Sequence, residues 1–387
     1  TLVIVPLFIF MGVLAVRAGL ARAGFDISSW LLRRLPGGAA LSSLAGSGLF
    51  AAVTGSSLAT VATMARVSTD SIVQSGHNIR LAAGVVCAGG TLGVLIPPSI
   101  ILVLYGVVTG ESIGRLLLAG IGPGLLTIAA YAVTIIVIAL ISKKNTSKEI
   151  SDLLDETSRD VNNSITHKLD IMGGAYLAII FIVSIGTIYM GVATPTEAAS
   201  FGVLAALIIF IIRTKFSEVF RELRESLSET IGLTAMTFLL IAGAGVFTYF
   251  LALSGASAAL VDIIVSSGMS PYVVLILCLL ILLPLGMFLD GVSMILVAAP
   301  LLHEILVSYG FEGIWLAILI VKVAEMALIT PPVGMNVFVY SGAVKESTLN
   351  MAFRGVIPFI LADFVVVAII IAVPDIVTFL PDLSGAK

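Results

Sequence analysis

Two kinds of motif, each present twice, supply the side chains and backbone carbonyls of this chain that are best suited to bind ions. The sequences TGSS at 54–57 and DGVS at 290–293 place hydroxyl, carboxylate and glycine residues inside apolar segments. A Pro-Pro pair follows each of them, at 97–98 and at 331–332, inside a further apolar segment. Because proline lacks an amide hydrogen and clashes with the preceding turn, each pair should break a helix and leave carbonyl groups unpaired. Carbonyl and hydroxyl oxygens suit a hard cation such as sodium.

The surroundings of these motifs predict how they are arranged. Unpaired backbone groups at membrane depth are tolerated only around a cavity or a bound ion. We therefore interpret the segments around 54–57 and 290–293 as hairpins that enter and leave a membrane on one side. Helix N-termini favour anions and C-terminal carbonyls favour cations, so two tips facing two broken helices predict cation sites beside a carboxylate site. The alternative is that the prolines only kink packed helices and the small residues only permit close contact.

The composition requires a membrane around most of the chain. Apolar residues make up 59% of the sequence and charged residues 11%, with a mean hydropathy of +1.17. Barrel-like alternation of polar and apolar residues is absent, so we expect an all-α polytopic protein. The sequence has no nucleotide-binding GxxxxGK[ST] motif, no HExxH and no GxSxG, and no basic aromatic surface for nucleic acid, so nothing in it indicates an enzyme. The chain begins at Thr1 inside an apolar segment, and we expect further helices before it.

The chain aligns with itself at one offset. The motifs above match at offsets of 236 and 234, and Gly19 matches Gly255 while Gly120 matches Gly355, at 236 and 235. This predicts two repeats. The first is residues 1–125, with a hairpin at about 36–64 and a broken helix at about 81–106. The second is residues 237–373, with a hairpin at about 271–306 and a broken helix at about 314–340. Residues 126–236 connect them, and 374–387 form a C-terminal tail.

The basic residues predict that the two repeats have opposite orientations. Arg17, Arg22, Arg33 and Arg34 follow the first apolar helix, whereas the equivalent stretch, 254–270, has no basic residue. Since Lys and Arg favour the cytoplasmic side, equivalent segments should face opposite sides of the membrane. The same rule predicts a cytoplasmic loop at 142–170 and an amphipathic surface helix at about 214–229.

Four ionisable residues lie in apolar segments, where a charge is costly and marks a candidate for function. Lys322 and Glu325 lie three residues apart, so they could pair on one helix face, either as a structural ion pair or near the site. Asp290 is the stronger functional candidate because it lies at the second tip. Asp363 could be a buried structural carboxylate or contribute to function.

Seven motifs resemble those of one transporter family. They are PLFIFMG at 6–12, FAAVTGSSLATVATM at 50–64, GTLGVLIPPSI at 90–100, YGVVTGESIGRLLLAGIGPGLL at 105–126, ATPTEAAS at 193–200, GMFLDGVSMIL at 286–296 and ITPPVGMNVFV at 329–339. With them the chain resembles the large, DctM-like membrane subunit of tripartite ATP-independent periplasmic (TRAP) transporters. The resemblance implies a multi-pass protein of the prokaryotic inner membrane that imports an organic acid by sodium symport and an elevator motion. It also implies a small four-helix membrane subunit and a periplasmic solute-binding protein as partners.

The resemblance and the repeat also imply the binding residues. The first sodium site would use Thr54, Ser56, Gly93, Ile96 and Pro98. The second would use Asp290, Val292, Ala327, Thr330 and Pro332. Ser57, Ser99 and Asn336 are candidates for contacts to the substrate. Thr54 and the pair at 59–60 depart from the serine-rich and acidic residues expected near the first tip, which puts individual ligands in question.

Other functions remain as alternatives. A stand-alone ion-coupled carboxylate transporter of the same superfamily would share this architecture without a binding protein. A passive channel fits less well, because channels rarely need two mirrored hairpins facing two broken helices. A membrane-embedded enzyme fits less well, because it would need a polar catalytic cluster that the sequence lacks. The sequence leaves C4-dicarboxylates, sialic acid and other organic acids open as substrates.

Overall fold

The structure is a computed structural model that describes residues 2–149, 170–266 and 268–384. Within these ranges all regular secondary structure is helical. Seven helices are long and apolar enough to cross a membrane, or nine if each of two bent helix pairs counts as one span. The prediction of an all-α polytopic membrane protein is therefore confirmed.

The first half of the chain contains a bent helix, a hairpin and a broken helix. The bent helix changes direction by 67° at Gly19, whose φ of 71° is one that glycine adopts readily. A 44° bend separates the two parts of the broken helix. The elements are α1 (Ile4–Arg17) with α2 (Leu20–Leu32), the hairpin α3 (Gly38–Thr54) with α4 (Ser57–Gln74), the broken helix α5 (Ile79–Leu95) with α6 (Ile100–Thr109), then α7 (Ile113–Ala119) and α8 (Ile121–Glu149).

The second half repeats this order of elements. Gly255 has a φ of 69° and separates two helices as Gly19 does, and Gly310 (φ 87°) ends the second hairpin as Gly76 (φ 86°) ends the first. The elements are α12 (Phe216–Ser254) with α13 (Ala256–Ser266), the hairpin α14 (Pro271–Phe288) with α15 (Gly291–Ser308), the broken helix α16 (Gly313–Ala327) with α17 (Met335–Ala343), then α18 (Leu349–Ala372) and α19 (Asp375–Ser384). The Pro-Pro bonds at 97–98 and 331–332 are both cis.

Two further spans connect the halves. The first comprises α9 (Ile171–Phe181), a π-helical turn (Ile182–Gly186) and α10 (Thr187–Tyr189), and the second is α11 (Pro195–Arg213). Thr194 and Glu197 form a reciprocal capping box at the start of α11.

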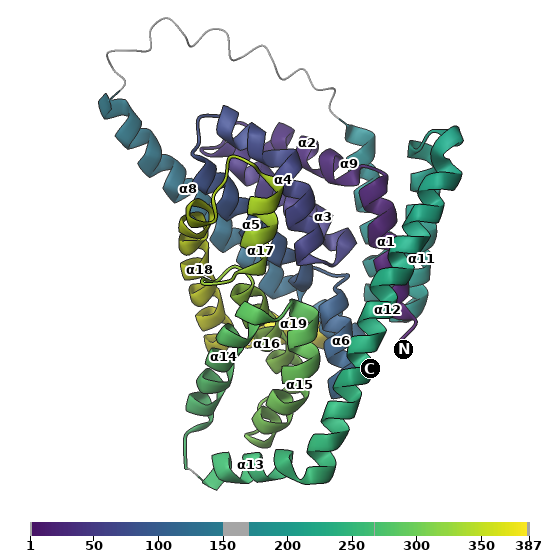
Figure 1. Cartoon of the computed structure of the whole chain (residues 1–387), viewed down its shortest axis with the longest axis vertical. Helices are drawn as coiled ribbons and strands as arrows, with labels where there is room; N and C mark the ends of the chain where they lie inside the picture. Colours follow the sequence, from purple (N-terminus) through teal and green to yellow (C-terminus); the bar gives the residue numbers. More distant parts are fainter. Residues whose placement is uncertain (1, 150–169, 267, 385–387) are drawn as a thin grey trace, which may run out of the picture.

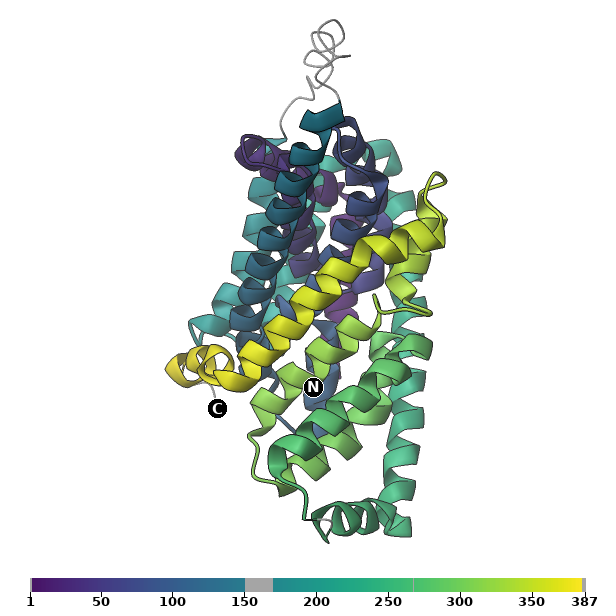
Figure 2. The ribbon, with the colours of Figure 1, turned by 90° about the vertical axis from the view of Figure 1, so that its left-hand side faces the viewer.

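The two hairpins enter the molecule from opposite ends. In Figure 1, α3 and α4 lie in the upper half and α14 and α15 in the lower half, while α12 runs along one side of the molecule. Figure 2 shows α18 crossing the molecule diagonally between the two halves. This arrangement brings the tips of both hairpins toward the middle.

Three segments outside the repeats differ from the sequence-based prediction. The segment at 214–229 is not a separate surface helix, because α12 continues unbroken from Phe216 to Ser254. Arg17 of α1 forms ion pairs with Glu222, Glu225 and Glu229 of α12, at 2.8, 2.8 and 3.1 Å. These ion pairs hold the start of α12 against α1. Most of the C-terminal tail at 374–387 is helical, as α19. In the proposed loop at 142–170, residues 142–149 continue α8, whereas 150–169 lie outside the described residues.

Candidate functional site

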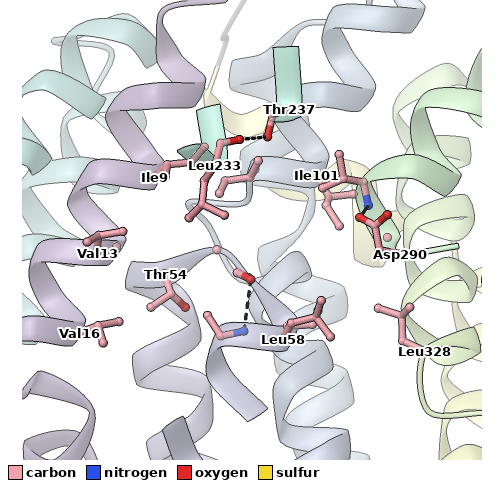
Figure 3. Close-up of a pocket in the computed structure, with 18 of the residues that line it drawn as sticks. Ile9, Val13, Val16, Thr54, Leu58, Ile101, Leu233, Thr237, Asp290 and Leu328 are labelled. Carbon is pink, nitrogen blue, oxygen red and sulfur yellow. Dashed lines mark hydrogen bonds between the residues drawn. The ribbon is translucent and has the colours of Figure 1, made fainter. Parts of the chain in front are cut away.

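A cavity of about 200 Å³ lies between the two hairpin tips and two long helices. Residues 54–59 contribute the first tip and residues 290–292 the second. Figure 3 shows Thr54, Asp290 and the apolar wall facing this space. The apolar residues of that wall are Ile9, Val13 and Val16 of α1 and Leu233 of α12, and the polar Glu229 and Thr237 of α12 line the cavity beside them. The cavity therefore lies where the repeats meet, against helices outside the hairpins.

The first tip is a tight turn packed on the break of the first broken helix. Helix α3 ends at Thr54, and Gly55 follows with a φ of 60°. A Cβ on Gly55 would lie 2.7 Å from the Pro98 carbonyl oxygen, so the tip and the break touch through their backbones. Ser56 caps α4 by accepting a hydrogen bond from the Ala59 amide at 3.4 Å. Helix α4 therefore has its N-terminus at the cavity.

The second tip is held by a carboxylate. Asp290 caps α15 by accepting hydrogen bonds from the amides of Val292 and Ser293, at 3.2 and 3.4 Å, and from the Ser293 hydroxyl. Aspartate is among the best N-cap residues, so this arrangement accounts for the side chain structurally. Asp290 also lines the cavity.

The two breaks differ in exposure. Pro97, Pro98 and Ser99 are buried, and Ser99 caps α6 by accepting a hydrogen bond from the Leu102 amide at 3.2 Å. Pro331 and Pro332 are exposed in the isolated chain. The first break is thus enclosed by protein and the second is open at the surface of this chain.

The structure brings some of the predicted ligands together at the cavity. Thr54 and Ser56 of the first sodium set, Asp290 and Val292 of the second, and the substrate candidate Ser57 all line it. The other eight lie behind the tips or at the breaks: Gly93, Ile96, Pro98, Ala327, Thr330, Pro332, Ser99 and Asn336. Their assignment as ligands stays a prediction.

Several residues behind the tips contact them or pack elsewhere. A Cβ on Gly93 would lie 3.4 Å from the Ser56 carbonyl carbon, so α5 supports the first tip closely. The Thr330 hydroxyl donates a hydrogen bond to the Met326 carbonyl at 2.7 Å. Asn336 is fully buried and donates to the Cys87 carbonyl at 3.2 Å, away from the cavity lining.

The pairing expected between Lys322 and Glu325 is wrong. Lys322 binds Asp363 of α18 at 2.5 Å, and the Tyr131 hydroxyl of α8 donates to the same carboxylate at 2.7 and 2.8 Å. Glu325 instead accepts a hydrogen bond from the Ser57 hydroxyl. Spacing along α16 places both residues on one face, but it does not reveal that separate partners reach each of them.

Sequence reasoning left Glu325 open between an ion pair and a role near the site, and it missed the wall. Glu325 lines the cavity from α16, and α1 contributes residues of the PLFIFMG motif and the turn after it. The intramembrane carboxylate was a usable signal for Glu325. The wall left no such signal, because apolar residues facing a cavity and apolar residues facing lipid are alike in sequence.

Comparisons with known proteins agree with this architecture. Residues 1–376 match the family described as the DctM component of the tripartite ATP-independent periplasmic transporter. The chain is 32% identical to the C4-dicarboxylate TRAP transporter large permease protein DctM of Pseudomonas aeruginosa, over all of this chain and 87% of that one. It is 28% identical to the ectoine TRAP transporter large permease protein TeaC of Halomonas elongata, over 99% of this chain and 87% of that one.

A solved structure shares the fold at low sequence identity. The YdaH transporter of Alcanivorax borkumensis superimposes with a TM-score of 0.63 at 13% identity, covering 96% of this chain and 84% of its own. Together with the family match over nearly the whole chain, the multi-pass helical fold and the mirrored hairpins identify this chain as a member of the DctM component family of tripartite ATP-independent periplasmic transporters, the large permease subunit of such a transporter in the inner membrane.

Proposed function

We propose that this subunit imports a small organic acid by sodium symport, with an elevator motion of the two hairpins. The observation that carries the proposal is the cavity in which both tips meet against α1 and α12. C4-dicarboxylates, sialic acid and similar carboxylates are the candidate substrates. A volume of about 200 Å³ favours a small solute, since pockets for drug-sized ligands are roughly 300–1,000 Å³.

The tips supply groups for both a carboxylate and cations. Helices α4 and α15 begin at the cavity, and helix N-termini stabilise anionic groups. Helices α3 and α14 end beside them, and their last carbonyls favour cations. Sodium bound at the first tip and break, and again at the second, would fix each tip against its broken helix. The organic acid would then lie between the two occupied tips.

An elevator motion agrees with the chemistry of the wall. The side chains that α1 and α12 turn to the cavity are apolar except for Glu229 and Thr237. Glu229 is paired with Arg17 of α1, and Thr237 donates to the Leu233 carbonyl within α12. Tips could slide along such a surface without breaking directional contacts. We therefore assign α1 and α12 to the static part and the hairpins with their broken helices to the moving part.

The proposed partners follow from the family. A small membrane subunit would cover apolar surface of this chain, and a periplasmic solute-binding protein would deliver the substrate. The need for each of these two partners can be tested in the same experiment that measures transport.

The decisive experiment is uptake into liposomes that contain this subunit and its small membrane partner. Radiolabelled succinate and sialic acid are supplied with the binding protein, with and without an inward sodium gradient. Uptake that requires both sodium and the binding protein supports the proposal. Uptake by this chain alone would instead indicate a stand-alone transporter, and uptake that ignores sodium would refute sodium symport.

A further inference from the structure

Glu325 is a buried carboxylate that reaches both hairpin tips. It lies on α16 two residues before the helix ends, it has no exposed surface, and it lines the cavity. Its Oε2 accepts a hydrogen bond from Ser57 of the first tip. Its Oε1 has no hydrogen-bond partner among the described residues, and it lies 3.0 Å from where a Cβ of Gly291 in the second tip would be.

No basic side chain pairs with Glu325 in the described part of the chain, and none lines the cavity. The nearest basic side chain along α16, Lys322, is bound to Asp363. The residues that line the cavity include Glu229, Asp290 and Glu325, and none of them is Lys, Arg or His. Glu229 is paired with Arg17, whereas Asp290 and Glu325 have no ion-pair partner in the described part of the chain. A buried, unpartnered carboxylate oxygen is costly, so its place at the cavity calls for a ligand.

We propose that Glu325 is a cation-binding residue of this cavity, whose Oε1 contacts either a sodium ion or the positively charged group of a zwitterionic solute. The proposal rests on the proposed transport function, because it assigns a ligand to the same cavity. It adds a charged contact between the tips to ligand sets that otherwise consist mainly of backbone oxygens. It also predicts that a dianionic solute enters this acidic cavity only in the company of cations.

Three variants separate the charge of Glu325 from its hydrogen bond. Glu325→Gln replaces the carboxyl group with an amide of the same size, which cannot carry a negative charge but can still bond to Ser57. Ser57→Ala removes the hydrogen bond and keeps the charge. Glu346→Gln neutralises an exposed carboxylate outside the cavity and is the matched control.

Binding to the purified complex with its small subunit is the primary measurement, because it does not require transport. The melting temperature is titrated with sodium chloride against choline chloride at constant ionic strength. A second titration uses ectoine, a zwitterion, and succinate, a dianion. We expect Glu325→Gln to raise one half-saturating concentration about tenfold, either that of sodium or that of ectoine. The half-saturating concentration of succinate should not change in the second case. Sodium as the affected ligand identifies an ion site, and ectoine identifies a contact to the solute.

Three results would overturn the proposal. One is that Glu325→Gln leaves every midpoint within about twofold of wild type. Another is that Ser57→Ala reproduces the whole effect, in which case Glu325 only anchors the tip. The third is that wild type responds to neither sodium nor ectoine. Failure of the transport function gives a different pattern: sodium still stabilises the wild-type complex in a Glu325-dependent way, while liposomes take up no solute with a sodium gradient.

Discussion

At the scale of single residues, Lys322 and Asp363 form a fully buried ion pair between α16 and α18. Tyr131 completes it, because its hydroxyl donates to Asp363 and its ring lies 5.5 Å from the Lys322 ammonium. Such a pair contributes little net stability over apolar residues, but removing one partner leaves a buried charge uncompensated. The pair therefore fixes which face of α16 meets α18.

Replacing only one member of this pair should be strongly destabilising. We expect Lys322→Met to cost about 3–5 kcal/mol of stability, because Asp363 loses its counter-charge. The double variant Lys322→Met with Asp363→Leu should recover most of the loss. Thermal unfolding of the purified protein measures both, with the exposed Lys345→Met as control. Equal melting temperatures for Lys322→Met and wild type would contradict the assignment.

Asp290 allows its two roles to be separated. Asparagine caps helices about as well as aspartate, so Asp290→Asn should keep the stability of α15 and lose only the charge. Asp290→Ala should cost a further ~1 kcal/mol through the lost cap. If Asp290 is a sodium ligand, both variants weaken sodium-dependent stabilisation in a melting titration. A wild-type sodium midpoint in Asp290→Asn would leave Asp290 as a cap alone.

Individual residues also show which features of the site could be predicted from the sequence and which could not. The tips at 54–57 and 290–293 were recognisable because hydroxyl and carboxylate groups are rare inside apolar segments. The partners of Lys322 and Glu325 were not, because Asp363 and Ser57 come from elements far away in the chain. Periodicity places a side chain on a helix face, but only the packing of helices determines what it meets.

At the scale of elements, the contact between α5 and α18 depends on two glycines. A Cβ on Gly84 would lie 2.8 Å from the Gly355 carbonyl carbon, and a Cβ on Gly355 would lie 3.1 Å from the Gly84 amide nitrogen. The two helices therefore cross in backbone contact, as small residues permit between membrane helices. Gly355 was noticed in the sequence for its place in the repeat, whereas its partner Gly84 could not be found without the fold.

This crossing should not tolerate even a methyl group. We expect Gly84→Ala to destabilise the protein by about 1–3 kcal/mol, because the helices must move apart. Gly342→Ala in α17 is the matched control, since nothing lies within 4 Å of its added Cβ and alanine favours a helix. Melting temperatures and yields of the two variants provide the comparison. A loss of stability in Gly342→Ala as large as in Gly84→Ala would show that the close contact at this crossing does not cause the destabilisation.

At the scale of the whole molecule, some landmarks of the predicted repeat coincide with fixed backbone geometry. Gly19 and Gly255, which the sequence aligned, both have a positive φ between two helices. Gly76 and Gly310, which the sequence analysis did not use, both have a positive φ after a hairpin. The continuity of α12 was not readable, because a charged segment beside an apolar one looks like a surface helix in sequence. Three of its four glutamates, Glu222, Glu225 and Glu229, instead bind Arg17 of α1, a contact between distant segments.

If the tips move as a unit along α1 and α12, residues on that wall must change their exposure during transport. Val16 lines the cavity from α1 and is 37% exposed, so Val16→Cys should be reachable by a membrane-impermeant maleimide. The native Cys87 and Cys278 are buried and can be replaced by alanine to give a silent background. We expect sodium with substrate to change the labelling rate of Val16→Cys several-fold, because the tips then occupy another position.

Phe216→Cys, at a side chain that is 97% exposed and remote from the cavity, should label at a constant rate. Constant labelling at Val16→Cys in a variant that still transports would place the moving boundary elsewhere, because a wall that the tips slide along cannot keep the same exposure in both positions.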